Sequence, residues 1–340
     1  MNRIRKLILL FLLLFVASLT FDCNQNGSNK TASSSNLENK VVINEAARTL
    51  LYLPLYHAKE AGFFSKNGLD VEIVTGGTAT NSFAAMTSGQ AQFSQADPMY
   101  VPISNEKGAD TRVIAQVVSK IAVWGLTMNP NITAMNKKTL EGKIISTHIK
   151  PMTAYAYTEK TIRDLGLDPE KDVKILQNKP GSEITPMLLG QAQYAMTLEP
   201  SVAIAKSQGA KVIFSYPDAL GDQIFTALMA KQDYIGKHQD VVLAVLKSYQ
   251  EALNDIYANR NAALKTAQKY FPQLKPEIVA AALKHVLDEG VIPHSILMTN
   301  QSWDKAIAVR VKAGDLKKAT PRDQNVRTDL IDKVLKDVKK

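Results

Sequence analysis

The sequence predicts an α/β fold made of two similar lobes, and three observations predict it. Short runs of β-branched residues alternate with helical stretches in the first two thirds of the chain, one segment of this region occurs twice, and the last third is nearly all helical. The predicted strands lie at residues 41–43, 71–74, 113–118, 144–145, 173–176 and 212–214. Beyond residue 230 the apolar residues instead recur at helical spacing, as at Val242, Val245, Leu246 and Tyr249. We therefore expect open sheets in the lobes and a helical C-terminal region.

The repeated segment predicts one structural unit in each lobe. Residues 86–93 (MTSGQAQF) recur as residues 187–194 (MLLGQAQY), and each copy is followed by an acid and a proline, at Asp97 and at Glu199. In each copy we expect a helix to end at the glycine, a strand to begin at the aromatic residue, and the acid–proline pair to open the next helix. Chance identity at a Gly-Gln turn is the alternative. If the lobes are related, their strand ends face one another across a cleft, which makes both acids candidate ligand-binding residues.

The first residues are typical of an export signal. Arg3, Arg5 and Lys6 precede an apolar run at residues 7–19. A helix of that length reaches roughly 20 Å, which is short of the ~30 Å hydrocarbon core of a membrane. We therefore predict a signal peptide at residues 1–22, which takes no part in the fold.

Cys23 is the only cysteine in the chain, and a polar tract rich in Ser and Asn follows it. The tract predicts a flexible tether at residues 23–39. A lone cysteine in this place resembles the lipid-attachment residue of bacterial lipoproteins, although Thr20, Phe21 and Asp22 replace the small residues usual before it. Lipidation of Cys23 would place the protein in the periplasm or cell envelope, anchored to a membrane. Simple cleavage and an uncleaved anchor are the alternatives.

Composition and motifs exclude several classes of function. The chain is 45% apolar, and its formal charge of +9 is scattered among acids, which argues against nucleic-acid binding. The five histidines are dispersed without metal-ligand spacing, and a single cysteine cannot form an intrachain disulfide. The sequence contains no Gly-x-Ser-x-Gly elbow, phosphate-binding loop or dinucleotide fingerprint. We therefore predict no catalytic residue, no metal and no cofactor.

The region after the tether resembles a known family. Residues 53–56 (LPLY), 58–64 (AKEAGFF), 68–72 (GLDVE) and 76–77 (GG) are similar to the opening of periplasmic binding proteins for nitrate, sulfonates, taurine and thiamine-pyrimidine precursors. The resemblance implies a two-lobe type 2 periplasmic binding protein fold, in which residues 40–127 and 226–340 form lobe one and residues 128–225 form lobe two. It also implies a hinge of two crossings. Residues 128–131 and 221–225 contain turn-forming residues and are our candidates for it.

The resemblance further implies a function and partners. The chain would be the extracytoplasmic solute-binding component of an ABC importer, would act as a monomer, and would hand a small solute to a permease and ATPase complex. Hinge closure over the solute would be its mechanism. An enzyme on the same fold is one alternative, although this chain lacks the cysteine-rich run of the thiamine-pyrimidine synthases of the yeast type. A binding protein that feeds a membrane sensor is another.

The candidate ligand-binding residues lie where strands end or helices begin. Gly77 and Thr78 sit at one helix start, where free backbone N–H groups can meet an anion or a carbonyl oxygen, and Thr153 and Tyr155 hold the corresponding place in lobe two. Aromatic rings could stack on a planar solute. The full set is Tyr52, Tyr56, Gly77, Thr78, Asp97, Trp124, Thr153, Tyr155 and Glu199. Ordinary helix caps, core packing and local capping by the acids are the alternatives.

The two acids bear on the chemistry of the solute. Carboxylates in the cleft would repel a fully anionic solute such as nitrate. They suit an aminopyrimidine, or a zwitterion such as taurine, if the side chains point into the cleft. The sequence therefore favours a small organic solute of the sulfonate or taurine type, or of the pyrimidine-precursor type, without choosing between them.

Overall fold

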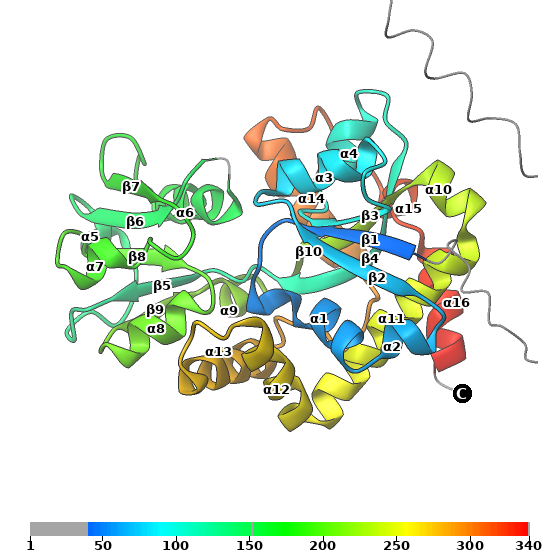
Figure 1. The fold of residues 1–340 in the computed structure, drawn as a ribbon. Helices are drawn as coiled ribbons and strands as arrows, with labels where there is room; N and C mark the ends of the chain where they lie inside the picture. Colours follow the sequence, from blue (N-terminus) through cyan, green and yellow to red (C-terminus); the bar gives the residue numbers. More distant parts are fainter. Residues whose placement is uncertain (1–39, 151, 339–340) are drawn as a thin grey trace, which may run out of the picture. The chain divides into compact units, whose positions relative to one another are not determined.

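Two five-stranded sheets organise the residues that the computed structural model describes, which are 40–150 and 152–338 (Figure 1). The first sheet has the order β2-β1-β3-β10-β4, and the second has the order β7-β6-β8-β5-β9. The strands of the first sheet are β1 (Lys40–Glu45), β2 (Asp70–Thr75), β3 (Phe93–Ala96), β4 (Thr111–Lys120) and β10 (Asp222–Lys231). Those of the second are β5 (Trp124–Thr127), β6 (Ile144–His148), β7 (Lys174–Asn178), β8 (Tyr194–Thr197) and β9 (Lys211–Ser215). The predicted signal peptide and the tether with Cys23 lie outside the described residues.

The two sheets have the same pattern of strand directions. In the first sheet, β1 pairs in parallel with β2 and β3, and β10 runs antiparallel between β3 and β4. In the second, β6 pairs in parallel with β7 and β8, and β5 runs antiparallel between β8 and β9. The carboxyl ends of the parallel strands therefore lie together at one edge of each sheet, which is where ligands bind to open α/β sheets.

Helices connect the strands and fill the C-terminal third. Those between strands of the first sheet are η2 (Leu50–Tyr52), α1 (Leu53–Glu60), α2 (Phe63–Lys66), α3 (Ala79–Thr87) and α4 (Tyr100–Asn105). Those that follow β5 are α5 (Lys137–Leu140), α6 (Thr153–Asp164), α7 (Thr185–Leu188), α8 (Ser201–Ser207) and α9 (Tyr216–Leu220). The C-terminal helices are α10 (Gln232–Lys237), α11 (Gln239–Ala258), α12 (Arg260–Tyr270), α13 (Pro276–Asp288), α14 (Asn300–Ala313), α15 (Arg322–Asn325) and α16 (Thr328–Val338). Among the helices described, none combines the length and the apolar character that a membrane span requires.

The sequence repeat has a structural basis in its second glutamine. The Oε1 atom of Gln92 accepts the backbone N–H of Val42 at 2.8 Å, and the Oε1 atom of Gln193 accepts that of Ile144 at 2.9 Å. Val42 and Ile144 lie on β1 and β6, which hold the same position in the two sheets. Each copy thus ties the start of its own strand to the neighbouring parallel strand, β3 to β1 and β8 to β6. The helix, glycine turn and strand of each copy also follow in the predicted order.

The chain passes between the sheets at one place that differs from the predicted hinge candidates and at one that overlaps them at Gly221. It leaves β4 at Lys120 and enters β5 at Trp124, whereas the predicted turn at 128–131 follows β5. It returns between the end of β9 and Asp222, the first residue of β10, so that Gly221 alone of the predicted 221–225 lies in this crossing. Residues 124–127, assigned to lobe one, therefore pair in the second sheet, and residues 222–225, assigned to lobe two, belong to a strand of the first. The chain needs no tight turn to run from β4 into β5. The predicted turn-forming residues at 128–131 instead mark the end of β5.

The two crossings run side by side. Asp222 pairs with Lys120 in the first sheet, and the backbone N–H of Tyr216 donates to the carbonyl of Val123 at 3.1 Å. The first crossing leads into β5, which runs antiparallel in the second sheet. The second crossing leads into β10, which runs antiparallel in the first sheet. The paired crossings therefore place the strand ends of both sheets next to a common set of connecting residues.

Candidate functional site

A small cavity at these connections is lined by residues from the first sheet, its loops and α14, and from helix α6 beside the second sheet. Its volume is about 20 Å³, which is room for about one water molecule. Asp97 and Met99 follow β3, Thr153 and Tyr157 lie in the first two turns of α6, and Ile121 belongs to the first crossing. The remaining lining residues come from β10 and α14: Ile224, Phe225, Ala306, Val309 and Arg310. Two predicted site residues, Asp97 and Thr153, thus meet at one cavity.

Asp97 is paired with an arginine that the sequence analysis missed. Its Oδ1 atom accepts the backbone N–H of Met99 at 2.9 Å, and its Oδ2 atom forms an ion pair with Nη2 of Arg310. Arg310 also donates to Asp315 at 3.1 Å. The negative charge of Asp97 raises the pKa of Arg310, although burial opposes it. The lining of the cavity therefore contains two opposite charges that neutralise each other. The side chain of Asp97 is 11% exposed and that of Arg310 is 19% exposed.

Tyr157 connects α6 to the first sheet beside this pair. Gln223 Nε2, on β10, donates a hydrogen bond to the hydroxyl of Tyr157. Burial and the charge of Asp97 both raise the pKa of Tyr157, while Arg310 lowers it, so this phenol stays protonated. The sequence analysis selected Tyr155 instead. Because helical neighbours two positions apart point in different directions, only the three-dimensional arrangement distinguishes the two tyrosines.

Gly77 and Thr78 form the predicted helix start at the end of β2. Gly77 has a φ of +79°, and Thr78 caps α3 by accepting the backbone N–H of Asn81 at 3.1 Å. The preceding Gly76 has no space for a side chain, since a Cβ atom there would lie 2.6 Å from Asn44 Oδ1 and 3.0 Å from the backbone nitrogen of Ser82. Both Gly77 and Thr78 are exposed. Contact between this helix start and a solute stays a prediction.

The predicted aromatic residues have protein neighbours. Tyr56 is fully buried, donates its hydroxyl to Glu45 Oε2 at 2.5 Å, and stacks on Tyr270 with ring centroids 4.3 Å apart. Tyr52 is buried in η2. The ring centroid of Tyr155 lies 4.7 Å from the ammonium nitrogen of Lys150. Ligand contact by these rings stays a prediction.

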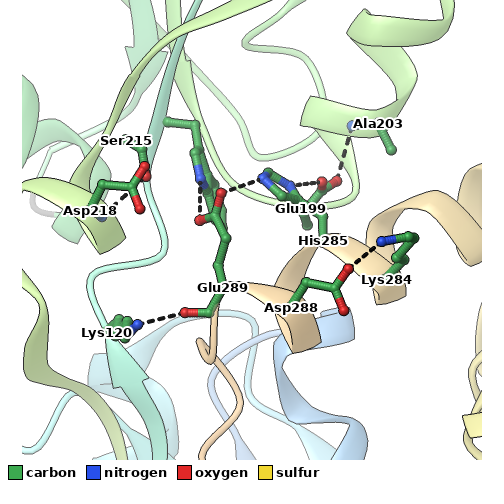
Figure 2. Close-up of polar contacts among 10 residues, drawn as sticks. Lys120, Glu199, Ala203, Ser215, Asp218, Lys284, His285, Asp288 and Glu289 are labelled. Carbon is green, nitrogen blue, oxygen red and sulfur yellow. Dashed lines mark hydrogen bonds and ion pairs between the residues drawn. The ribbon is translucent and has the colours of Figure 1, made fainter.

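Glu199 has a different environment from its counterpart in the repeat. Its side chain is buried, its Oε1 atom lies 2.6 Å from Nδ1 of His285, and its Oε2 atom accepts the backbone N–H of Ala203 at 3.0 Å (Figure 2). Glu199 is not among the residues that line the cavity. Predicted Trp124 lies beside His285, and the centroids of the two rings are 4.8 Å apart. The repeated acids therefore each pair with a base from the C-terminal helices, Arg310 for Asp97 and His285 for Glu199.

Sequence patterns also missed two buried carboxylates, one at the end of β1 and one in the loop after β7. Glu45, the last residue of β1, accepts hydrogen bonds from Tyr56, from Thr75 Oγ1 at 2.7 Å and from Arg48 Nε at 2.8 Å. Glu183, shortly after β7, accepts from the hydroxyl of Thr197 and lies 3.5 Å from Nε2 of His148. Each carboxylate fastens the loops around it. An acid at the end of a predicted strand is the signal that could have indicated Glu45, whereas Glu183 lies in the loop beyond the end of β7 and has no such signal.

A model of the family described as NMT1/THI5 like matches residues 51–263, which is more than half of the chain. The chain belongs to the NMT1/THI5-like family. This NMT1/THI5-like chain is also 25% identical, over 306 residues, to YtlA of Bacillus subtilis, provisionally named a binding protein; the match covers 87% of the chain and 90% of YtlA.

Two solved structures show the fold of this NMT1/THI5-like chain. The periplasmic aliphatic sulphonate binding protein SsuA of Escherichia coli matches with a TM-score of 0.69 and 16% identity, over 84% of the chain and 91% of SsuA. The periplasmic nitrate-binding protein NrtA of Synechocystis PCC 6803 matches with a TM-score of 0.68 and 15% identity, over 88% of the chain and 89% of NrtA. The predicted α/β fold of periplasmic binding proteins and the predicted family resemblance are confirmed.

Proposed function

We propose that this chain is the extracytoplasmic solute-binding component of an ABC importer. It would capture a small organic solute between the strand ends of its two sheets and pass it to a permease and ATPase complex. The observation that carries the proposal is the cavity that is lined from the side of each sheet, by Asp97 directly after β3 of the first and by Tyr157 on α6, which packs on β6 of the second. Membership of the NMT1/THI5-like family and likeness to SsuA, NrtA and YtlA support it. Export, lipid attachment at Cys23 and a monomeric state belong to the same proposal.

The Asp97–Arg310 pair favours a solute that carries both an anionic group and a hydrogen-bond donor or cation. Such a solute can exchange the internal ion pair for two new pairs, its donor facing Asp97 and its anionic group facing Arg310. A solute with a single charge would instead leave one partly buried protein charge without a partner, which is costly. We therefore place aminosulfonates such as taurine ahead of simple anions, with aminopyrimidines, which offer donors to Asp97, as the second class.

Solute entry requires the sheets to separate. Sites for small molecules have volumes on the order of 300–1,000 Å³, far above the volume of about 20 Å³ found here. The paired crossings, 121–123 and 216–221, are the covalent links between the sheets, so rotation at these residues is the simplest way to open the cavity. Loading in an open form and closure over the solute follow as the mechanism.

A thermal-shift screen tests the proposal. The purified chain is heated with taurine, alkanesulfonates, nitrate and aminopyrimidines, and a solute that binds only the folded protein raises the melting temperature by mass action. We expect taurine-like zwitterions to give the largest shift. Asp97→Asn and Arg310→Gln should each abolish it, whereas Arg163→Gln, an exposed arginine on α6, should not. The proposed site is wrong if Asp97→Asn responds to the solutes as the wild type does, and a screen in which no solute shifts the transition contradicts the proposed solute classes.

A further inference from the structure

Helix α13 contacts both flanks of the first crossing through one residue, Glu289, which directly follows the helix (Figure 2). The ammonium of Lys120, the last residue of β4, donates to the carbonyl oxygen of Glu289 at 2.6 Å. The indole N–H of Trp124, the first residue of β5, donates to the Oε2 atom of the same residue at 3.0 Å. Glu289 therefore brackets residues 121–123, and Ile121 among these lines the proposed solute cavity.

His285 joins this bracket to the acid–proline corner of the second sheet. Its Nδ1 atom lies 2.6 Å from Glu199 Oε1, and its Nε2 atom lies 2.9 Å from Glu289 Oε1. Only an imidazolium can donate from both nitrogens, because a neutral imidazole would present a lone pair to one carboxylate. Burial lowers the pKa of His285, but the hydrogen bonds and charges of the two carboxylates outweigh burial and raise it to about 9.

The charged side chains on α13 and β4 near His285 have their own partners. On α13, Lys284 pairs with Asp288, which also binds Arg260 of α12 at 2.6 Å. From β4, Lys120 donates to a backbone carbonyl of Glu289. On α9, Asp218 is a further acid nearby, and its backbone N–H donates to the hydroxyl of Ser215 at 3.3 Å (Figure 2). The carboxylates hydrogen-bonded to His285 are thus those of Glu199 and Glu289. Without the imidazolium, the buried Glu199 would keep only the backbone N–H of Ala203.

Apolar packing continues the connection. The buried face of α13, which includes Leu283 and Val286, belongs to the same core cluster as Val202 and Ala203 of α8. Trp124 of β5 belongs to this cluster as well. Helix α13 packs against α8, and its His285 ring lies beside that of Trp124 on β5. The backbone that follows α13 is fastened to β4, where the Ser119 N–H donates to the Val291 carbonyl at 3.0 Å.

We propose that His285, held as an imidazolium between Glu199 and Glu289, is a positioning residue for the solute site. It fastens α13 to the acid–proline corner of the second sheet, and α13 through Glu289 holds both flanks of the first crossing. The angle between the two sheets is then set by a third, noncovalent connection in addition to the two chain crossings. This inference rests on the proposed function, since an angle between the sheets matters for a site that both sheets form.

The test measures the distance between the sheets without any solute. Spin labels are placed on the full chain carrying Cys23→Ser, Glu72→Cys on β2 and Lys174→Cys on β7, and distance distributions are recorded at pH 7 and pH 10, which span the pKa of about 9. We expect a narrow distribution at pH 7 that broadens about twofold at pH 10, as the lost proton releases α13. His285→Gln and Glu199→Gln should be broad at both pH values. His294→Gln, which changes an exposed histidine, should behave as the wild type.

A second variant separates positioning from general destabilisation. Trp124→Phe removes the indole donor to Glu289 and keeps an aromatic ring in the core, so we expect intermediate width that still depends on pH. An NMR titration of the His285 ring follows its proton directly, and its pKa should fall in Glu199→Gln. A distribution in His285→Gln as narrow as that of the wild type overturns the proposal, and so does a wild-type distribution that stays narrow after His285 has lost its proton. Because no solute is added, this outcome is independent of the solute screen.

Discussion

At the scale of single residues, Glu183 shows how a buried charge can be stabilising. Its side chain is 1% exposed, yet it lies beside His148 and accepts from the hydroxyl of Thr197. Burial raises the pKa of this carboxyl, but the neighbouring His148 and the hydroxyls of Ser201 and Thr197 outweigh burial and lower it from 4.5 to about 2. The ionised form of Glu183, relative to its protonated form, is therefore more stable in the folded protein than in the unfolded chain.

The sign of this shift predicts acid sensitivity. Since the folded pKa lies below the unfolded one, Glu183 contributes its stabilisation above pH 4.5 and loses it as the pH falls toward 2. Glu183→Gln should lower the free energy of unfolding at pH 7 by about 2–3 kcal/mol and should reduce its loss between pH 4.5 and pH 2. Urea titrations at a series of pH values measure both effects. Glu170→Gln, an exposed control, should match the wild type, and an acid profile of Glu183→Gln parallel to that of the wild type contradicts the role.

The repeated acids show what could be predicted at this scale. The repeat indicated that Asp97 and Glu199 hold corresponding places, and the structure puts each directly after a corresponding strand, β3 or β8. It could not indicate their partners, because Arg310 lies 213 residues beyond Asp97 and His285 lies 86 residues beyond Glu199. Both bases sit on C-terminal helices outside the repeat and belong to no motif. Partner identity depends on how those helices pack, which a local pattern does not contain.

At the scale of elements, the repeat encodes strand pairing. Gln92 and Gln193 make the same hydrogen bond to the first and second sheet, whereas Gln90 and Gln191, which the repeat also contains, are exposed and show no side-chain hydrogen bond in the described part of the chain. The identity of the repeat thus includes positions with a role in pairing and positions without one.

This difference can be measured by paired substitutions. Gln92→Ala and Gln193→Ala should each lower the free energy of unfolding by about 1 kcal/mol, because each leaves a strand N–H without its acceptor. Gln90→Ala and Gln191→Ala provide matched controls of the same chemistry and should cost less than about 0.5 kcal/mol. Denaturant unfolding of the four variants makes the comparison. If Gln92→Ala and Gln90→Ala, or Gln193→Ala and Gln191→Ala, lower the free energy of unfolding equally, the hydrogen bond to the strand is not what the repeat preserves.

The elements that sequence patterns missed are the two antiparallel strands. The predicted β-branched runs all coincide with strands, and the repeat located β3 and β8. By contrast, β5 and β10 follow the crossings directly and do not belong to a strand–helix–strand unit, so the alternation that revealed the others could not reveal them. The first crossing between the sheets was not located for the same reason, since turn residues mark where the chain reverses rather than where it passes from one sheet to the next.

At the scale of the whole molecule, the fold accounts for a site made of distant segments. Parallel strands of each sheet end at one edge, the crossings lie between the sheets, and a C-terminal helix returns to supply Arg310. The fold class could be predicted because alternation and repetition extend over the first two thirds of the chain and helical spacing over the last third. The volume of the cavity could not, because it depends on side chains that meet only after both sheets and the C-terminal helices have packed.

That volume leads to a prediction about the motion of the molecule. A cavity of about 20 Å³ cannot admit an organic solute, so binding must proceed through a form in which the sheets lie farther apart. If that open form is well populated without solute, saturating solute should lower the radius of gyration measured by small-angle scattering, because contacts from both sheets favour closure. Asp97→Asn should show no compaction at the same solute concentration, since it lacks the carboxylate that the solute would engage. A radius that is unchanged at saturation in the wild type would mean that the solute binds without closure, and rotation about residues 121–123 and 216–221 would then play no part in capture.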